Sequence, residues 1–130
     1  MKKILTLVCC TILLAATSCT KKYVTPASTT IFKTASNWQL QNNSPAGFFG
    51  YVATVSVPEI DSYFDDNGTV TVAVDYGTGE YEPLSNVNGG NSLWYTYDVS
   101  GRITLYSQNP DGSAPSASPG NLKLKIVLLP

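Results

Sequence analysis

The residue types that carry most enzyme chemistry are scarce in this sequence. The 130-residue chain has no histidine, three cysteines and a charged fraction of only 13%. Histidine is the most frequent general base and the most frequent protein ligand of transition metals. A serine nucleophile would therefore have no imidazole to activate it, and a lysine as the base is the remaining alternative. These absences favour a protein that is not an enzyme, with no metal and no cofactor.

Two stretches do gather oxygen-bearing side chains, at residues 61–67 and 109–113. Calcium needs about six to eight oxygen ligands, and neither stretch follows the spacing of a known calcium loop. We expect both stretches to be residues at the end of a helix or in turns. Glu80 and Glu82 are also conceivable as the carboxylate pair of a glycosidase. Because neighbours in sequence rarely lie across a substrate, we do not expect them to act in this way.

The most specific local geometry is a hairpin between residues 94 and 106. If Asp98 pairs with Arg102, residues 99–101 form a three-residue loop that ends in glycine, a favoured hairpin connection. This register places Trp94 opposite Tyr106 on one face of the sheet. Aromatic rings can stack on sugar rings while charged groups bind sugar hydroxyls, so these four residues are the candidate ligand-binding site. A cross-strand aromatic pair that only stabilises the sheet, and a face covered by another sheet, are the competing interpretations, and the first is the commoner situation.

The segments that must position these residues alternate between apolar and polar side chains. Residues 69–76 and 121–128 alternate most regularly, and a period of two indicates strands with one buried face. Clusters of Gly, Asn, Asp and Pro separate the segments. About seven short strands then predict an all-β fold, a single antiparallel β-sandwich of immunoglobulin-like layering. The expected strands are 31–34, 38–41, 48–57, 69–76, 93–98, 102–107 and 122–129.

One segment breaks the alternation and predicts a short helix. Ser56 and Glu59 have the spacing of a capping box, with Pro58 at a position that a helix start tolerates. Residues 60, 63 and 64 would share one face, and Gly68 would end the helix after about two turns. We expect this helix to cover one end of the sandwich.

The last strand becomes apolar on both faces at residues 127–129, which predicts a position inside a sheet.

The N-terminal segment has the pattern of a signal peptide. Lys2 and Lys3 precede an uncharged run at residues 4–16, which is too short for a membrane-spanning helix. Thr17, Ser18 and Cys19 then supply small residues at a cleavage position. This order resembles a bacterial lipoprotein signal of the Bacteroidota type, with alanine at position 16 where that family prefers leucine. The resemblance implies that Cys19 carries the lipid and becomes the new N-terminus, and a palmitate-type acyl anchor follows from it.

This resemblance divides the chain into three parts. Residues 1–18 are expected to be the signal peptide, residues 19–30 the lipidated N-terminus and tether, and residues 31–130 the sandwich domain. The cut leaves 112 residues and Cys19 as the only cysteine. From position 29 onward four basic residues face nine acidic ones, a formal net charge of −5. Such a surface does not favour nucleic acid as a partner.

A second resemblance concerns the domain itself. Residues 57–60 (Val-Pro-Glu-Ile), 68–72 (Gly-Thr-Val-Thr-Val) and 125–130 (Lys-Ile-Val-Leu-Leu-Pro) resemble a group of small Bacteroidota lipoproteins. The likeness implies a fold and carries no activity with it.

Together the patterns predict a lipid-anchored cell-envelope protein, held at the outer membrane, whose domain is a non-catalytic binding or structural module. Residues 20–23 (Thr-Lys-Lys-Tyr) lack the acidic residues that resemble a surface-export signal, so we expect the protein to face the periplasm. A carbohydrate-binding accessory lipoprotein, a small glycan hydrolase, and a subunit that pairs with an envelope protein through an edge strand are the alternatives.

Overall fold

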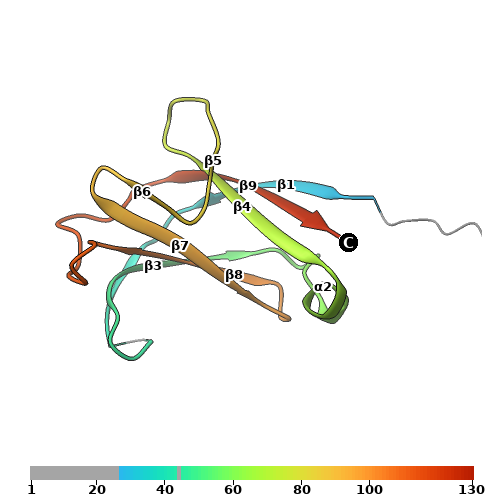
Figure 1. Ribbon diagram of the computed structural model, residues 1–130, viewed down its shortest axis with the longest axis horizontal. Coiled ribbons are helices and arrows are strands. Elements are labelled where there is room, and N and C mark those ends of the chain that lie inside the picture. The colour runs from blue at the N-terminus through green and yellow to red at the C-terminus, as the bar shows by residue number, and fades with distance from the viewer. Residues whose placement is uncertain (1–26, 44) are drawn as a thin grey trace, which may run out of the picture.

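The computed structural model describes residues 27–43 and 45–130, which form two antiparallel sheets packed face to face (Figure 1). One sheet has the strand order β1-β9-β4-β5 and the other has the order β2-β3-β8-β7-β6. The strands are β1 (Thr29–Ala35), β2 (Gln39–Asn42), β3 (Phe49–Ser56), β4 (Thr69–Asp75), β5 (Glu82–Pro83), β6 (Asn86–Asn88), β7 (Asn91–Asp98), β8 (Arg102–Gln108) and β9 (Leu122–Leu129). The expected all-β sandwich with one short helix is confirmed.

All seven expected strands are present, and two further strands were not expected. β5 and β6 have two and three residues, which is too short for an alternating pattern to be visible. β1 also begins earlier than the expected strand at residues 31–34, because Thr29 and Thr30 already pair with Leu128 and Val127. The first and last strands of the described domain, β1 and β9, lie side by side in one sheet.

The core lies between the sheets and is built from the alternating positions of their strands. β9 contributes Leu122, Leu124, Ile126 and Leu128, none of which is more than 4% exposed. β9 also has a neighbour on each side, because it pairs with β1 and with β4. The prediction that the last strand is interior to a sheet is therefore confirmed.

The short helix exists, but the prediction of its start was wrong. α2 spans Ser62–Asn67 and is capped by Asp61, whose carboxylate accepts from the backbone amides of Tyr63 (3.0 Å) and Phe64 (3.3 Å). Ser56 instead ends β3. The reason is local competition: Val57 and Ile60 are buried in the core and form a tight turn, in which the Ile60 amide donates to the Val57 carbonyl (3.0 Å). Asp61 is then the first residue that can cap a helix.

The face of the helix also differs from the expectation. Phe64 packs against the core, whereas Tyr63 is 47% exposed. The predicted end is confirmed, because the amide of Gly68 caps the helix by donating to the Phe64 carbonyl (3.1 Å).

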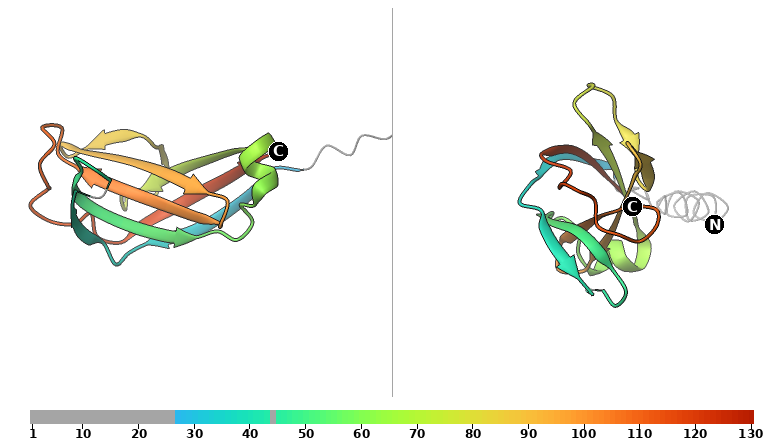
Figure 2. Two further views of the ribbon diagram at one scale, coloured as in Figure 1. Left: turned by 90° about the horizontal axis from the view of Figure 1, so that it is seen from below. Right: turned by 90° about the vertical axis from the view of Figure 1, so that its left-hand side faces the viewer.

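The two ends of the sandwich differ in what they carry (Figure 2). α2, the C-terminus and the start of β1 lie at one end, and the β2–β3 and β8–β9 loops lie at the other. In the part of the chain that the structure describes, no helix has the length and apolar character needed to cross a membrane. The predicted signal peptide, Cys19 and most of the tether fall within residues 1–26, outside the described residues.

Candidate functional site

The hairpin formed by β7 and β8 has the predicted register. Trp94 lies opposite Tyr106, Thr96 opposite Thr104, and Asp98 opposite Arg102. These residues point away from the core, while the alternate positions Leu93, Ile103 and Leu105 are buried in it. The structure therefore brings all four candidate residues onto the outer face of the five-stranded sheet, and the opposing sheet does not cover them.

Three aromatic rings form a cluster on this face. The Trp94 and Tyr106 rings are nearly parallel, with centroids 5.5 Å apart and an angle of 13° between the ring planes. Phe48 meets both rings edge-on, at 5.8 Å from Trp94 and 5.4 Å from Tyr106. Parallel-offset and edge-to-face pairs are the favourable arrangements of aromatic rings. Phe48 is only 5% exposed, so it fixes the position of the other two rings.

Phe48 reaches the cluster because the β2–β3 loop folds back over the sheet. Its amide donates to the Pro45 carbonyl (2.9 Å), and its carbonyl accepts from the Asn43 amide (2.6 Å). Beneath its ring lies Gly50, where an added Cβ would come within 2.8 Å of the ring and 2.3 Å of the Ser107 carbonyl oxygen. Glycine at position 50 is therefore required by this close approach.

Two hollows lie on either side of the aromatic pair. Tyr106 lines a hollow of about 360 Å³ together with Gln41, Pro45, Val52, Thr54, Arg102 and Thr104. Trp94 lines a smaller hollow of about 180 Å³ with residues from β6 and the segment before it. Hydroxyl, amide and guanidinium groups beside an aromatic ring supply both hydrogen bonds and an apolar surface. Such a lining suits an uncharged polar ligand better than an ion.

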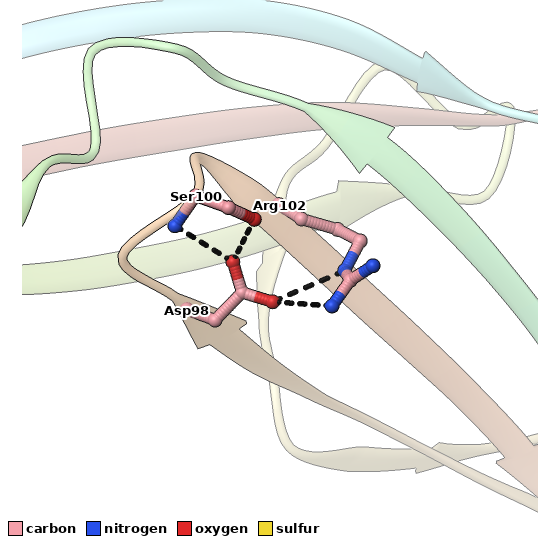
Figure 3. A network of polar contacts seen from close by, with 3 residues as sticks. All are labelled: Asp98, Ser100 and Arg102. Atoms are coloured by element: carbon pink, nitrogen blue, oxygen red, sulfur yellow. Dashed lines mark hydrogen bonds and ion pairs between the residues drawn. The ribbon is translucent and has the colours of Figure 1, made fainter.

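Asp98 holds Arg102 at the edge of the larger hollow (Figure 3). One carboxylate oxygen of Asp98 accepts from the Arg102 Nε (3.1 Å) and from a terminal guanidinium nitrogen (2.7 Å). The other oxygen accepts from the amide of Ser100 (2.9 Å) and from the Ser100 hydroxyl. The predicted pairing of Asp98 with Arg102 is present, and the Arg102 side chain is 60% exposed.

The Ser100 hydroxyl, followed by Arg102, lowers the pKa of the Asp98 carboxyl below its ordinary value of 3.8. The folded state therefore binds the proton less tightly than the unfolded chain. The ionised carboxylate contributes stability above the ordinary value, and this contribution is lost as the pH falls through the lower folded-state pKa.

Replacing Ser100 with alanine is expected to raise the Asp98 pKa, because the alanine side chain donates no hydrogen bond to the carboxylate. A carbon-detected NMR titration of the Asp98 carboxyl measures the change. Ser116→Ala, in the exposed β8–β9 loop, is the control and should leave the titration unchanged. An Asp98 midpoint that is the same in Ser100→Ala as in the unsubstituted protein would show that Ser100 does not set this pKa.

The oxygen-rich stretches serve local structure. Asp61 caps α2, and the side chain of Asn109 donates to the Ser113 hydroxyl (2.9 Å) and to the Ala114 carbonyl (3.1 Å) within its own loop. Across residues 27–43 and 45–130, no three His, Cys, Asp or Glu side chains are grouped so that they could hold a metal ion.

The sequence did not identify Phe48, Gly50 or Ser100 as parts of this site. A glycine inside the expected strand at residues 48–57 was the available signal, because such a glycine marks a close approach by another group. Ser100 follows Asp98 by two residues, a spacing at which an aspartate often accepts from the backbone.

No protein-family model, no curated protein and no solved structure matches this chain.

Proposed function

We propose that the protein is a non-catalytic binding module of the bacterial cell envelope, anchored by a lipid on Cys19 and facing the periplasm at the outer membrane. One observation of the fold carries the binding role. An aromatic cluster with hollows on both sides lies on a sheet face that the opposing sheet leaves open. The signal pattern that ends at Cys19 supports the anchor.

The end at which the chain enters the sandwich agrees with this role. Nine residues separate Cys19 from Thr29, the first residue of β1, and a chain of this length spans at most about 30 Å. β1 starts at the end that carries α2 (Figure 2), so the β2–β3 loop, which supplies Phe48, lies at the opposite end. A module tethered in this way keeps the aromatic cluster away from the membrane surface.

The acidic charge of the domain means that the domain by itself is not attracted to an anionic membrane. Four basic residues and nine acidic ones follow position 28. A net charge of −5 gives the domain no general attraction to anionic lipid head groups. Membrane association should therefore depend on the acyl chains, each of which contributes about 0.8 kcal/mol per buried CH₂ group.

Replacing Cys19 with serine is expected to abolish both lipid labelling and membrane association, because a serine hydroxyl cannot form the thioether. Metabolic labelling with an alkyne fatty acid and fractionation of the cells measure the two effects. Cys10→Ser is the matched control, since Cys10 lies within the expected signal peptide and should not be acylated. A Cys19→Ser protein that still sediments with membranes and carries label would refute the anchor.

Glycan binding by the outer face of the five-stranded sheet is a second candidate function, favoured by the lining of the larger hollow. Gln41, Thr54, Thr104 and Arg102 offer hydrogen-bonding groups beside the Tyr106 ring. Uncharged sugars present the same combination of hydroxyls and apolar ring faces.

Replacing Trp94 with alanine is then expected to weaken glycan binding at least about tenfold, the loss of one good aromatic contact. A glycan array followed by calorimetry on any sugar that binds measures the effect. Tyr63→Ala is the matched control, because Tyr63 is exposed on α2 at the other end of the sandwich. An array without binders, or equal affinity in Trp94→Ala, would count against glycans as the ligand.

A further inference from the structure

The four edge strands of the two sheets are not equally protected. β5, β2 and β6 are edge strands of two, four and three residues, whereas β1 has seven. Very short edge strands are one of the ways in which proteins prevent other chains from pairing with their sheets. β1 is the one edge in the described domain that does not use this protection (Figure 1).

β1 is also exposed along most of its length. Among the described residues β9 is its only strand neighbour, and five of its seven residues are exposed. Its sequence, Thr-Thr-Ile-Phe-Lys-Thr-Ala, contains neither glycine nor proline and is rich in residues that favour strands. The backbone groups on its free side are therefore presented in a conformation that a further strand can join.

Basic charge is concentrated beside this edge. Lys33 lies on β1 itself, on the same face as its buried neighbour Leu124. Lys123 and Lys125 of β9 lie opposite Thr34 and Phe32 of β1, and so on the outer face of the sheet. Three of the four basic residues of an otherwise acidic domain are thus within two neighbouring strands. Self-pairing through β1 would bring two such groups of lysines together, and like charges on neighbouring strands are destabilising. The charge disfavours a second copy of this chain and favours an acidic partner.

An exposed aromatic pair adds apolar surface next to the same edge. Phe32 is 62% exposed and Tyr81 is 38% exposed, and their ring centroids are 6.0 Å apart. Tyr81 precedes β5, at the far edge of this sheet, so the two rings meet across the outer face above β9 and β4. A side chain of a strand added to β1 would contact the Phe32 ring.

We propose that β1 is a docking strand that pairs with an extended segment of a partner protein, in which acidic residues alternate with apolar ones. Its free edge supplies main-chain hydrogen bonds. Lys33 attracts the acidic side chains on one face of the added strand, and Phe32 contacts the apolar side chains on the other face. This surface lies on the opposite sheet from the aromatic cluster, so it is independent of any ligand bound there.

A seven-residue peptide, Thr-Glu-Val-Glu-Val-Glu-Thr with blocked ends, tests the proposal against a peptide with lysine in place of each glutamate. Titration of the isotope-labelled domain is followed by amide chemical shifts and by hydrogen exchange. The glutamate peptide is expected to bind and to slow exchange at amides of β1, and the lysine peptide is not. Lys33→Glu is expected to weaken binding about tenfold, because it replaces an attraction by a repulsion.

The double variant Ser116→Asp/Ser118→Asp is the matched control. It lowers the net charge by the same two units in the exposed β8–β9 loop, and it should bind the glutamate peptide as the unsubstituted domain does. Equal binding of both peptides, or no protection of β1 with the glutamate peptide, would overturn the proposal. Protection of β1 in a concentration-dependent dimer without peptide would also overturn it, because the occupant would then be a second copy.

Discussion

Replacing Ile126 with alanine is expected to lower the free energy of unfolding by about 2–5 kcal/mol. Ile126 is fully buried in the middle of β9, between Ile31 of β1 and Val72 of β4. The substitution removes three carbon atoms from a position with neighbours on both sides and on the opposite sheet. The surrounding strands are hydrogen-bonded to β9 and cannot close the space, so most of the resulting cavity should persist.

Urea denaturation followed by tryptophan fluorescence measures this loss. Val127→Ala is the control from the same strand, because Val127 is half-buried and faces outward. We expect it to cost about 1 kcal/mol or less. Similar losses in the two variants would mean that β9 is not the central strand of the core.

Replacing Gly101 with alanine is expected to cost about 2–4 kcal/mol, from two separate sources. Gly101 has a φ of +77°, a conformation in which a side chain is strained. An added Cβ would also lie 2.7 Å from the Val57 carbonyl oxygen and 2.9 Å from the Pro58 Cα, both of them backbone atoms. The Gly101 carbonyl accepts from the Val57 amide (2.7 Å), so the two segments cannot separate without breaking that bond.

Gly112→Ala separates the backbone strain of a positive φ from the clash of the added Cβ with neighbouring atoms. Gly112 has a φ of +84°, and an added Cβ there meets nothing within 4 Å. It should cost only the strain, about 1–2 kcal/mol. The thermal midpoints of the two variants give the comparison, and a Gly112→Ala loss as large as that of Gly101→Ala would contradict the close approach of the hairpin loop to Val57.

Much of the fold followed from the period-two pattern. Residues 69–76 and 121–128 alternate so regularly that one face is expected to be buried, and the structure buries that face. The β7–β8 register also followed from the sequence, because a shift by one residue would mix apolar and polar faces. The positions of Trp94, Tyr106, Asp98 and Arg102 on one face are consequences of that single register.

The features that the sequence did not predict depend on contacts between residues distant in sequence, or on competition between residues that are adjacent in sequence. β5 pairs through only two residues, Glu82 and Pro83, and β6 through three, so their pairing is set by the strands beside them. The capping box at Ser56 obeyed the local rule for a helix start. It was overridden because burial of Val57 and Ile60 outweighs one capping interaction.

The aromatic cluster was also predicted only in part, because one of its three rings is positioned by a loop. Trp94 and Tyr106 could be paired from strand register alone, whereas Phe48 lies just before β3 and belongs to no strand. Its ring reaches the cluster only because the β2–β3 loop closes through hydrogen bonds to Pro45 and Asn43. Gly50 then leaves the space in which the ring lies.

The intact mass of the protein extracted from membranes by detergent tests the lipid anchor most directly. We expect a chain that begins at Cys19, with the added mass of a diacylglyceryl group on the cysteine and of any further acyl chain on its amine. A released fragment spanning the N-terminus should place the whole added mass on Cys19. A mature chain with an unmodified Cys19, or one that begins at another residue, would contradict the account.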